Sequence, residues 1–276
     1  MLDTDRRSHQ RALWTALFVT VLWSSSWVLI RIGLEKQSLP PLTFAGLRYF
    51  AAALVLWSWV GSSPARRSEV ASINASTWIQ LVALGLIFYT VTQGAQFIAI
   101  GAQPAATTSL LLAPTPLLVA VLSRGSLEEA VGIRQVGGAT LIMVGSVVFF
   151  AGDLGATVIG VTAAIVALLA NTTSSLLGRS VNRQRRLSPI TVTVVSMTFG
   201  ATLLLTVGLV VEEVPRLEWT ALLIVAWLAV VNTAWAFTLG MPRFVASLRS
   251  NQRPSTTQCS SRSPSLPGSS SENHPA

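Results

Sequence analysis

Eight apolar segments of membrane-spanning length follow one another along this chain of 276 residues. A helix needs roughly 20 apolar residues to cross about 30 Å of hydrocarbon. Lipid offers the backbone no hydrogen-bond partner, so each segment must satisfy its own peptide groups as a helix, and the short alternating strands of a β-barrel are absent. The segments cover residues 12–31, 42–60, 78–99, 105–123, 135–151, 158–178, 190–211 and 219–239. The sequence therefore predicts an all-α integral membrane protein, a bundle of about eight transmembrane helices.

Composition agrees with a chain embedded in a lipid bilayer. It is 51% hydrophobic and 11% charged, whereas a soluble domain carries about twice that charged fraction. In a soluble protein the net charge of +8 would suggest nucleic acid, but in a membrane protein it reports arginine-rich cytoplasmic loops, so no nucleic-acid partner is expected. The single Cys259 and the histidines at the two ends, His9 and His274, offer no metal cluster. We expect no metal and no cofactor.

The distribution of basic residues predicts the orientation. With the N-terminus inside, most of the 19 Lys and Arg residues fall in cytoplasmic segments, and the outer loops hold only Lys36 and Arg216. This predicts a multi-pass protein of the cytoplasmic membrane with residues 1–11 as a cytoplasmic N-terminus. Residues 240–276 are rich in Ser, Pro, Gln and Arg, which predicts a disordered tail.

The second half of the chain weakly repeats the first. Trp23-Ser24-Ser25-Ser26 aligns with Asn171-Thr172-Thr173-Ser174, and Pro41-Leu42-Thr43 aligns with Pro189-Ile190-Thr191. With a small gap, Trp78 aligns with Trp219. A unit of five spans is odd in number, so a second copy would be inverted across the membrane, as in many secondary transporters. The predicted units are residues 12–151, with five helices, and an incomplete second copy at 158–239, with three.

Several ordered motifs resemble those of the EamA-like drug/metabolite transporter superfamily. They are Trp23-Ser24-Ser25-Ser26 with Arg31-Ile32-Gly33-Leu34, Pro40 to Tyr49, Ala105-Ala106 with Pro114 and Pro116, and Glu129 with Gln135 and Gly138. The resemblance implies ten spans in two inverted repeats of five. This chain has eight apolar segments, and its polar tail after Gly240 resembles a truncation or a change of reading frame.

Arg48 is the one charge placed well inside an apolar segment. Such a charge is costly in lipid and indicates a functional site. The functional interpretation is a guanidinium that binds a carboxylate or phosphate in a water-filled cavity. The alternative is an arginine that extends to the outer interface, which is only about 9 Å away at 1.5 Å per residue.

Other polar and kink-forming residues within the spans are candidates for a substrate pathway. The hydroxyls could instead bond to their own helices, the tryptophan could pack in the core, and the prolines could be passive bends. The pathway candidates are Trp23, Ser24, Ser25, Ser26, Gln93, Gln96, Asn171, Thr172, Ser174 and Asn232, with Pro114 and Pro116 as helix kinks.

All acidic residues map to loops or termini, which disfavours a lipophilic cation as substrate. The sequence predicts a secondary transporter or exporter that moves a small neutral, zwitterionic or anionic metabolite, such as an amino acid, by alternating access. The alternative is a non-transporting truncated remnant or an assembly subunit, and a homodimer could complete a pathway. An enzyme is not expected, because the spans hold no His, Cys, Asp or Glu.

Overall fold

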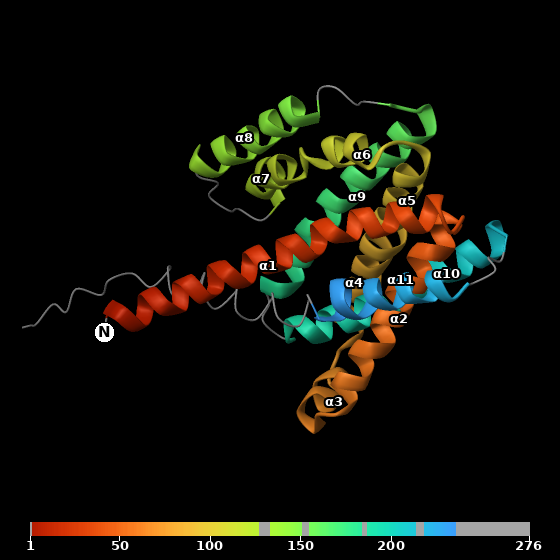
Figure 1. Ribbon diagram of the computed structural model, residues 1–276. Helices are drawn as coiled ribbons and strands as arrows, with labels where there is room; N and C mark the ends of the chain where they lie inside the picture. The colour runs from red at the N-terminus through yellow and green to blue at the C-terminus, as the bar shows by residue number, and fades with distance from the viewer. Residues whose placement is uncertain (1, 127–132, 151–154, 184–186, 214–217, 236–276) are drawn as a thin grey trace, which may run out of the picture.

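The computed structural model describes residues 2–126, 133–150, 155–183, 187–213 and 218–235 (Figure 1). Over these ranges the chain forms helices and no strand, which confirms the predicted all-α class. The first half contains α1 (Leu2–Glu35), α2 (Pro41–Gly61), α3 (Pro64–Ala71), α4 (Ala75–Gly85), the π-helix η1 (Leu86–Thr92), α5 (Gln93–Ala102), α6 (Ala105–Leu112) and α7 (Thr115–Ser126). The chain continues with α8 (Ile133–Phe150), α9 (Val158–Arg183), α10 (Pro189–Val211), α11 (Trp219–Ala229) and the π-helix η2 (Val230–Trp235).

Five helical stretches within the described ranges are long and apolar enough to cross a membrane. They are Pro41–Gly61, Ala75–Ala102, Ala105–Ser123, Val158–Arg183 and Pro189–Val211, and shorter apolar helices cover Val136–Gly145 and Trp219–Ala234. Together with α1, these helices overlap all eight predicted segments. The predicted tail, residues 240–276, lies outside the described residues.

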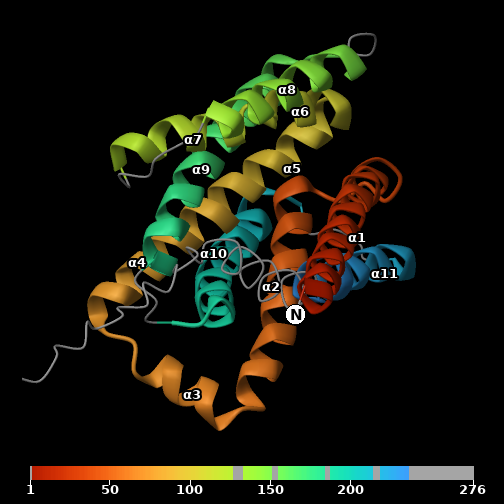
Figure 2. The ribbon, with the colours of Figure 1, turned by 90° about the vertical axis from the view of Figure 1, so that its left-hand side faces the viewer.

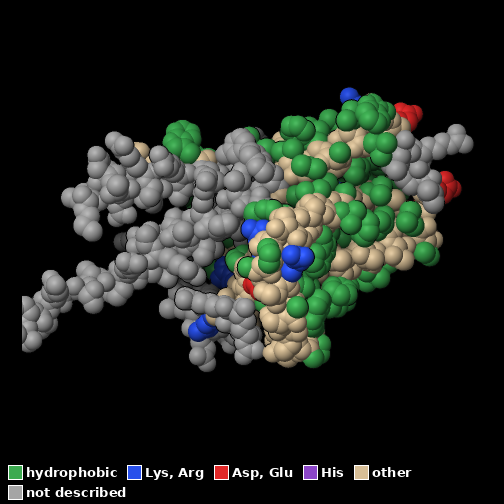
Figure 3. Space-filling view, turned by 90° about the horizontal axis from the view of Figure 1, so that it is seen from below, with side chains coloured by type: hydrophobic (Ala, Val, Ile, Leu, Met, Phe, Trp, Pro, Cys, Tyr) green, Lys and Arg blue, Asp and Glu red, His purple; other side chains and the backbone are tan. Residues whose placement is uncertain are grey.

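Apolar side chains cover much of the described part of the face that Figure 3 shows. Val210 is 79% exposed and Leu141 is 72% exposed, which would be unfavourable in water. These side chains are suited to contact with lipid.

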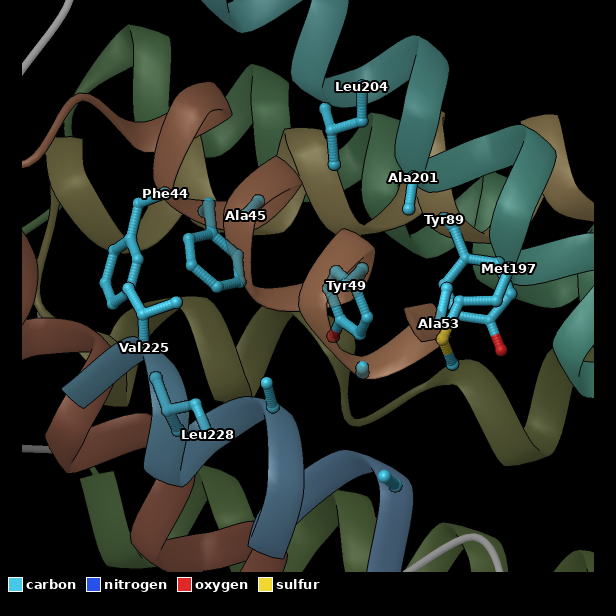
Figure 4. Packing of buried hydrophobic residues seen from close by; sticks show 14 of the residues in the cluster. Phe44, Ala45, Tyr49, Ala53, Tyr89, Met197, Ala201, Leu204, Val225 and Leu228 are labelled. Carbon is cyan, nitrogen blue, oxygen red and sulfur yellow. The ribbon is translucent and has the colours of Figure 1, made fainter. Parts of the chain in front are cut away.

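Helices α2 and α10 form an antiparallel pair at the centre of the core. Along this pair Trp57 Nε1 donates to Thr198 Oγ1 at 2.7 Å. Figure 4 shows Phe44, Ala45 and Tyr49 of α2 between side chains of α10 and of α11. These helices are the second spans of the two predicted units, and an inverted repeat requires them to run in opposite directions.

Small residues allow the helix pairs to approach closely. A Cβ atom on Gly46 of α2 would lie 2.5 Å from the Cα of Leu205 on α10. A Cβ atom on Gly200 of α10 would lie 2.1 Å from the backbone oxygen of Gly85 on α4. Glycine is therefore required at both crossings, because any side chain would push the backbones apart.

Two glutamates hold the ends of the α2–α10 pair. Glu212, directly after α10, accepts hydrogen bonds from the backbone N–H groups of Leu42 and Thr43 at 2.9 and 2.8 Å and from Thr43 Oγ1 at 2.9 Å. At the other end, Glu69 of α3 accepts from the Ser188 backbone N–H and, at 2.9 Å each, from the hydroxyls of Ser188 and Thr191. Each carboxylate thus satisfies free donors at a helix N-terminus, where a negative charge is also favoured.

The remaining helices pack around the α2–α10 pair. In both ribbon views α6, α7 and α8 lie together beside α9, at the opposite side of the molecule from α3 (Figure 2). Helix α11 packs against α2, α1 packs against α5, α11 and η2, and α9 packs against α4, η1 and α5. Helix α2 contacts both π-helices. Its Tyr49 packs against Tyr89 of η1, and its Arg48 donates a hydrogen bond to Thr233 of η2.

Candidate functional site

Arg48 of α2 lies inside the bundle. Its side chain is only 5% exposed, and its Nε donates to the hydroxyl of Thr233 on η2 at 3.2 Å. The guanidinium carbon lies 4.9 Å from the centre of the Tyr49 ring. Among the described residues, no carboxylate pairs with Arg48 and its terminal nitrogens have no hydrogen-bond partner. A buried guanidinium in this state favours an anionic occupant that can accept from those nitrogens.

Tyr49 connects the guanidinium to the third span. Its hydroxyl donates to Gln93 Oε1 at 2.7 Å, and its ring packs edge-on against Tyr89 of η1 with centroids 5.5 Å apart. All three side chains are buried. Nothing in the described ranges accepts a hydrogen bond from the amide nitrogen of Gln93. The Tyr49 ring therefore lies against Arg48, and the Gln93 amide and the Tyr89 ring adjoin Tyr49.

Asn232 adds a second amide from η2. Its Nδ2 donates to the backbone oxygen of Leu22 at 2.7 Å and to Ser25 Oγ at 3.3 Å, which fixes the orientation of the amide. Its Oδ1 is buried and accepts no hydrogen bond from the described chain. A buried acceptor without a donor is costly, so this oxygen is suited to receive an N–H or O–H group from a bound molecule or from water.

The serine and threonine candidates are mostly bonded to their own helices. Ser24 is exposed and donates to Thr20 O, and Ser25 donates to Leu22 O. In α9, Thr172 donates to Leu168 O and Ser174 donates to Asn171 O. The structure brings Ser25 to Asn232, whereas within the described ranges the other three hydroxyls make only these local bonds.

The other predicted residues take varied places. Ser26 is buried in α1, whereas Gln96 in α5 and Asn171 in α9 are half-buried. The side chain of Trp23 lies outside the described residues. Pro114 lies in the turn between α6 and α7, and Pro116 lies in the first turn of α7, so this span is divided into two helices.

Sequence reasoning did not single out Tyr49, Tyr89, Thr92 or Thr233. Tyr49 follows Arg48 directly, and Thr233 follows Asn232. The alignment of Trp78 with Trp219 also places Thr92 on Thr233, and this is the signal that could have identified both threonines.

Comparison with known proteins relates this arrangement to a family. A solved crystal structure has a TM-score of 0.58 and 20% identity over 83% of this chain and 84% of that chain, which shows a similar fold. Two uncharacterized transporters of Bacillus subtilis (strain 168), YoaV and YvbV, are each 28% identical over 73% and 74% of this chain. The matches cover 68% and 65% of those proteins, so the chain spans about two thirds of their length. The EamA-like transporter family matches residues 10–151, and this membrane transporter therefore belongs to that family, as its motifs predicted.

Proposed function

We propose that the protein is a secondary transporter that moves a small zwitterionic or anionic metabolite, such as an amino acid, across the cytoplasmic membrane by alternating access. The observation that carries this proposal is the buried Arg48, whose terminal nitrogens have no hydrogen-bond partner in the described part of the chain. An anionic group of the substrate would neutralise the guanidinium and accept from its N–H fork.

The groups around Arg48 suit the rest of such a molecule. Tyr49 and Tyr89 offer aromatic surfaces, and Gln93 offers an amide donor. Asn232 directly precedes Thr233, and its Oδ1, which accepts no hydrogen bond from the described residues, would accept one from an ammonium or hydroxyl group. No carboxylate neutralises the guanidinium in the described ranges, so a cationic substrate would meet uncompensated positive charge.

Flux through proteoliposomes tests the proposal. Labelled amino acids, other carboxylates and lipophilic cations would be compared in wild-type protein, Arg48→Ala, Arg48→Lys and the exposed control Arg67→Ala. We expect carboxylate flux in the wild type and in the control, and a fall of roughly 10- to 100-fold in Arg48→Ala, since a hydrogen bond to a charged group is worth about 1.5–3 kcal/mol. Arg48→Lys keeps the charge but loses the planar fork, so its flux should be intermediate.

The other outcomes separate the alternatives. If Arg48→Ala leaves the carboxylate flux unchanged, the substrate binds at a site that does not include Arg48. An absence of flux for every compound, from wild-type protein that is monodisperse and folded, would favour the non-transporting subunit that the sequence left open.

A further inference from the structure

Two π-helical turns occupy equivalent positions in the two halves of the chain. The turn η1 covers Leu86–Thr92 in the third span, and η2 covers Val230–Trp235 in the last described span. The alignment of Trp78 with Trp219 makes these turns overlap, residues 89–92 on 230–233, and places Thr92 on Thr233. Single π-helical turns inside α-helices are rare and occur frequently at functional sites.

The same side-chain hydrogen bond supports each turn. Thr92 Oγ1 donates to the backbone oxygen of Ile87, and Thr233 Oγ1 donates to that of Leu228, both at 2.9 Å and both over five residues. Under the same alignment Ile87 falls on Leu228. Threonines of the described α-helices that bond back along the chain in this way instead reach three or four residues, as Thr115 does to Leu112 and Thr206 does to Thr202. The bond over five residues therefore belongs to the wide turn, and both threonine side chains are 1% exposed.

Each threonine also lies next to the candidate site. The hydroxyl of Thr233 is both a donor and an acceptor: it donates to Leu228 O and accepts from Arg48 Nε at 3.2 Å. On the other side, Thr92 directly precedes Gln93, which accepts from Tyr49. Consecutive residues of α2 thus contact the two π-helical stretches, Arg48 at η2 and Tyr49 at the end of η1.

We infer that Thr92 and Thr233 are equivalent positioning residues for transport, each of which maintains a π-helical turn and thereby orients a group that faces the substrate. Thr233 orients the guanidinium of Arg48 directly. Thr92 orients Gln93 and, through it, Tyr49. A π turn that reverts to an α-helix rotates the residues after it by about 100° relative to those before it, because one residue of an α-helix turns through that angle. Gln93 would then no longer face Tyr49.

This inference rests on the proposed function, so its test uses the same carboxylate flux assay. The variants are Thr233→Val, Thr233→Ser, Thr92→Val and Thr92→Ser, and the matched control is Thr206→Val, whose hydroxyl bonds within an exposed turn of α10. Valine keeps the branched shape but removes the hydroxyl, whereas serine keeps the hydroxyl. We expect each valine variant to raise KM about tenfold or more, each serine variant to stay within about threefold of wild type, and the control to be unchanged.

A double-mutant cycle separates positioning from general stability. Lysine has no Nε–H group in the position where arginine donates to Thr233. In an Arg48→Lys background, Thr233→Val should therefore add little further loss, whereas Thr92→Val should still raise KM about tenfold. If Thr233→Val does not fold as a monodisperse species, the comparison of Thr92→Val with Thr92→Ser tests the same inference on η1.

Two results would overturn the inference while leaving the proposed function intact. One is Arg48-dependent flux that both valine variants preserve. The other is serine variants that lose as much as the valine variants, because the hydroxyl would then not be the positioning group. A wild type without Arg48-dependent flux would instead contradict the proposed function.

Discussion

At the scale of single residues, Glu212 and Glu69 show how this chain uses carboxylates. Both lie at helix ends outside the apolar stretches, and each binds the first turn of the partner helix in the α2–α10 pair. Both receiving turns begin with proline, at Pro41 and Pro189, which provides a preset backbone angle but no N–H group. The two glutamates therefore fix the ends of the central pair, so they have a structural role rather than a purely solvated one.

Removing the Glu212 carboxylate should loosen one end of the pair. We expect Glu212→Ala to lower the free energy of unfolding by about 1–3 kcal/mol, because it leaves the N–H groups of Leu42 and Thr43 without an acceptor. Glu212→Gln, which retains one acceptor oxygen, should lose less. Thermal unfolding in detergent micelles would measure the change. The neighbour Glu213 is exposed, so Glu213→Ala should unfold like the wild type, and an equal loss in both alanine variants would contradict the capping role.

At the scale of elements, α10 lies between two close neighbours. Its Gly208 approaches the start of α2, where an added Cβ would lie 2.6 Å from the Thr43 backbone nitrogen. Its Gly200 approaches the α4–η1 junction and would place a Cβ 2.8 Å from the Cβ of Tyr89. Because Tyr89 also packs against Tyr49, the packing of α10 sets the position of one wall of the candidate site.

A methyl group at Gly200 should therefore disturb both stability and transport. We expect Gly200→Ala to cost about 1–3 kcal/mol, since the backbone of α4 must move to accept it, and to reduce carboxylate flux because Tyr89 moves with it. The control is Gly138→Ala in α8, where nothing lies within 4 Å and alanine is the better helix former. Melting temperature and flux would be measured together on both variants. A stable and active Gly200→Ala protein would show that the α4–α10 crossing can relax without affecting the site.

At the scale of the whole molecule, the antiparallel α2–α10 pair gives the bundle two distinct ends. The loop after α1, with the exposed Lys36, lies at the same end as Glu212, and the exposed helix α3 lies at the other end. The arginine distribution predicts that the α3 end is cytoplasmic. Arg66 of α3 lies over the ring of Trp59, 4.2 Å from its centroid, an arrangement suited to a membrane interface.

Thiol labelling would establish the orientation in the membrane. In a Cys259→Ser background, Ser38→Cys and Ser72→Cys place one exposed thiol at each end of the bundle. A membrane-impermeant maleimide should label Ser38→Cys in intact cells and should label Ser72→Cys only after the membrane is permeabilised. The reverse pattern would invert the predicted topology.

The sequence by itself determined the features that are encoded locally along the chain. Apolar length predicted the helical spans, and short ordered motifs predicted the family. The amides Gln93 and Asn232 bond to residues on other helices, because a long amide buried in a span has to reach a partner there, and their place in a substrate pathway stays a prediction. The hydroxyls of Ser24, Thr172 and Ser174 are short enough to bond to their own helices, so their presence in a span is a weaker signal, and their pathway role stays a prediction.

Only the tertiary structure decided which polar groups meet. Arg48 bonds to Thr233, 185 residues later in the chain, and Asn232 bonds to Leu22, 210 residues earlier. Such contacts depend on how each helix is rotated about its axis, and a π-helical turn changes that rotation partway along a span. Local propensity does not encode a π turn, because the turn is maintained by packing and by a threonine hydroxyl whose partner depends on the fold.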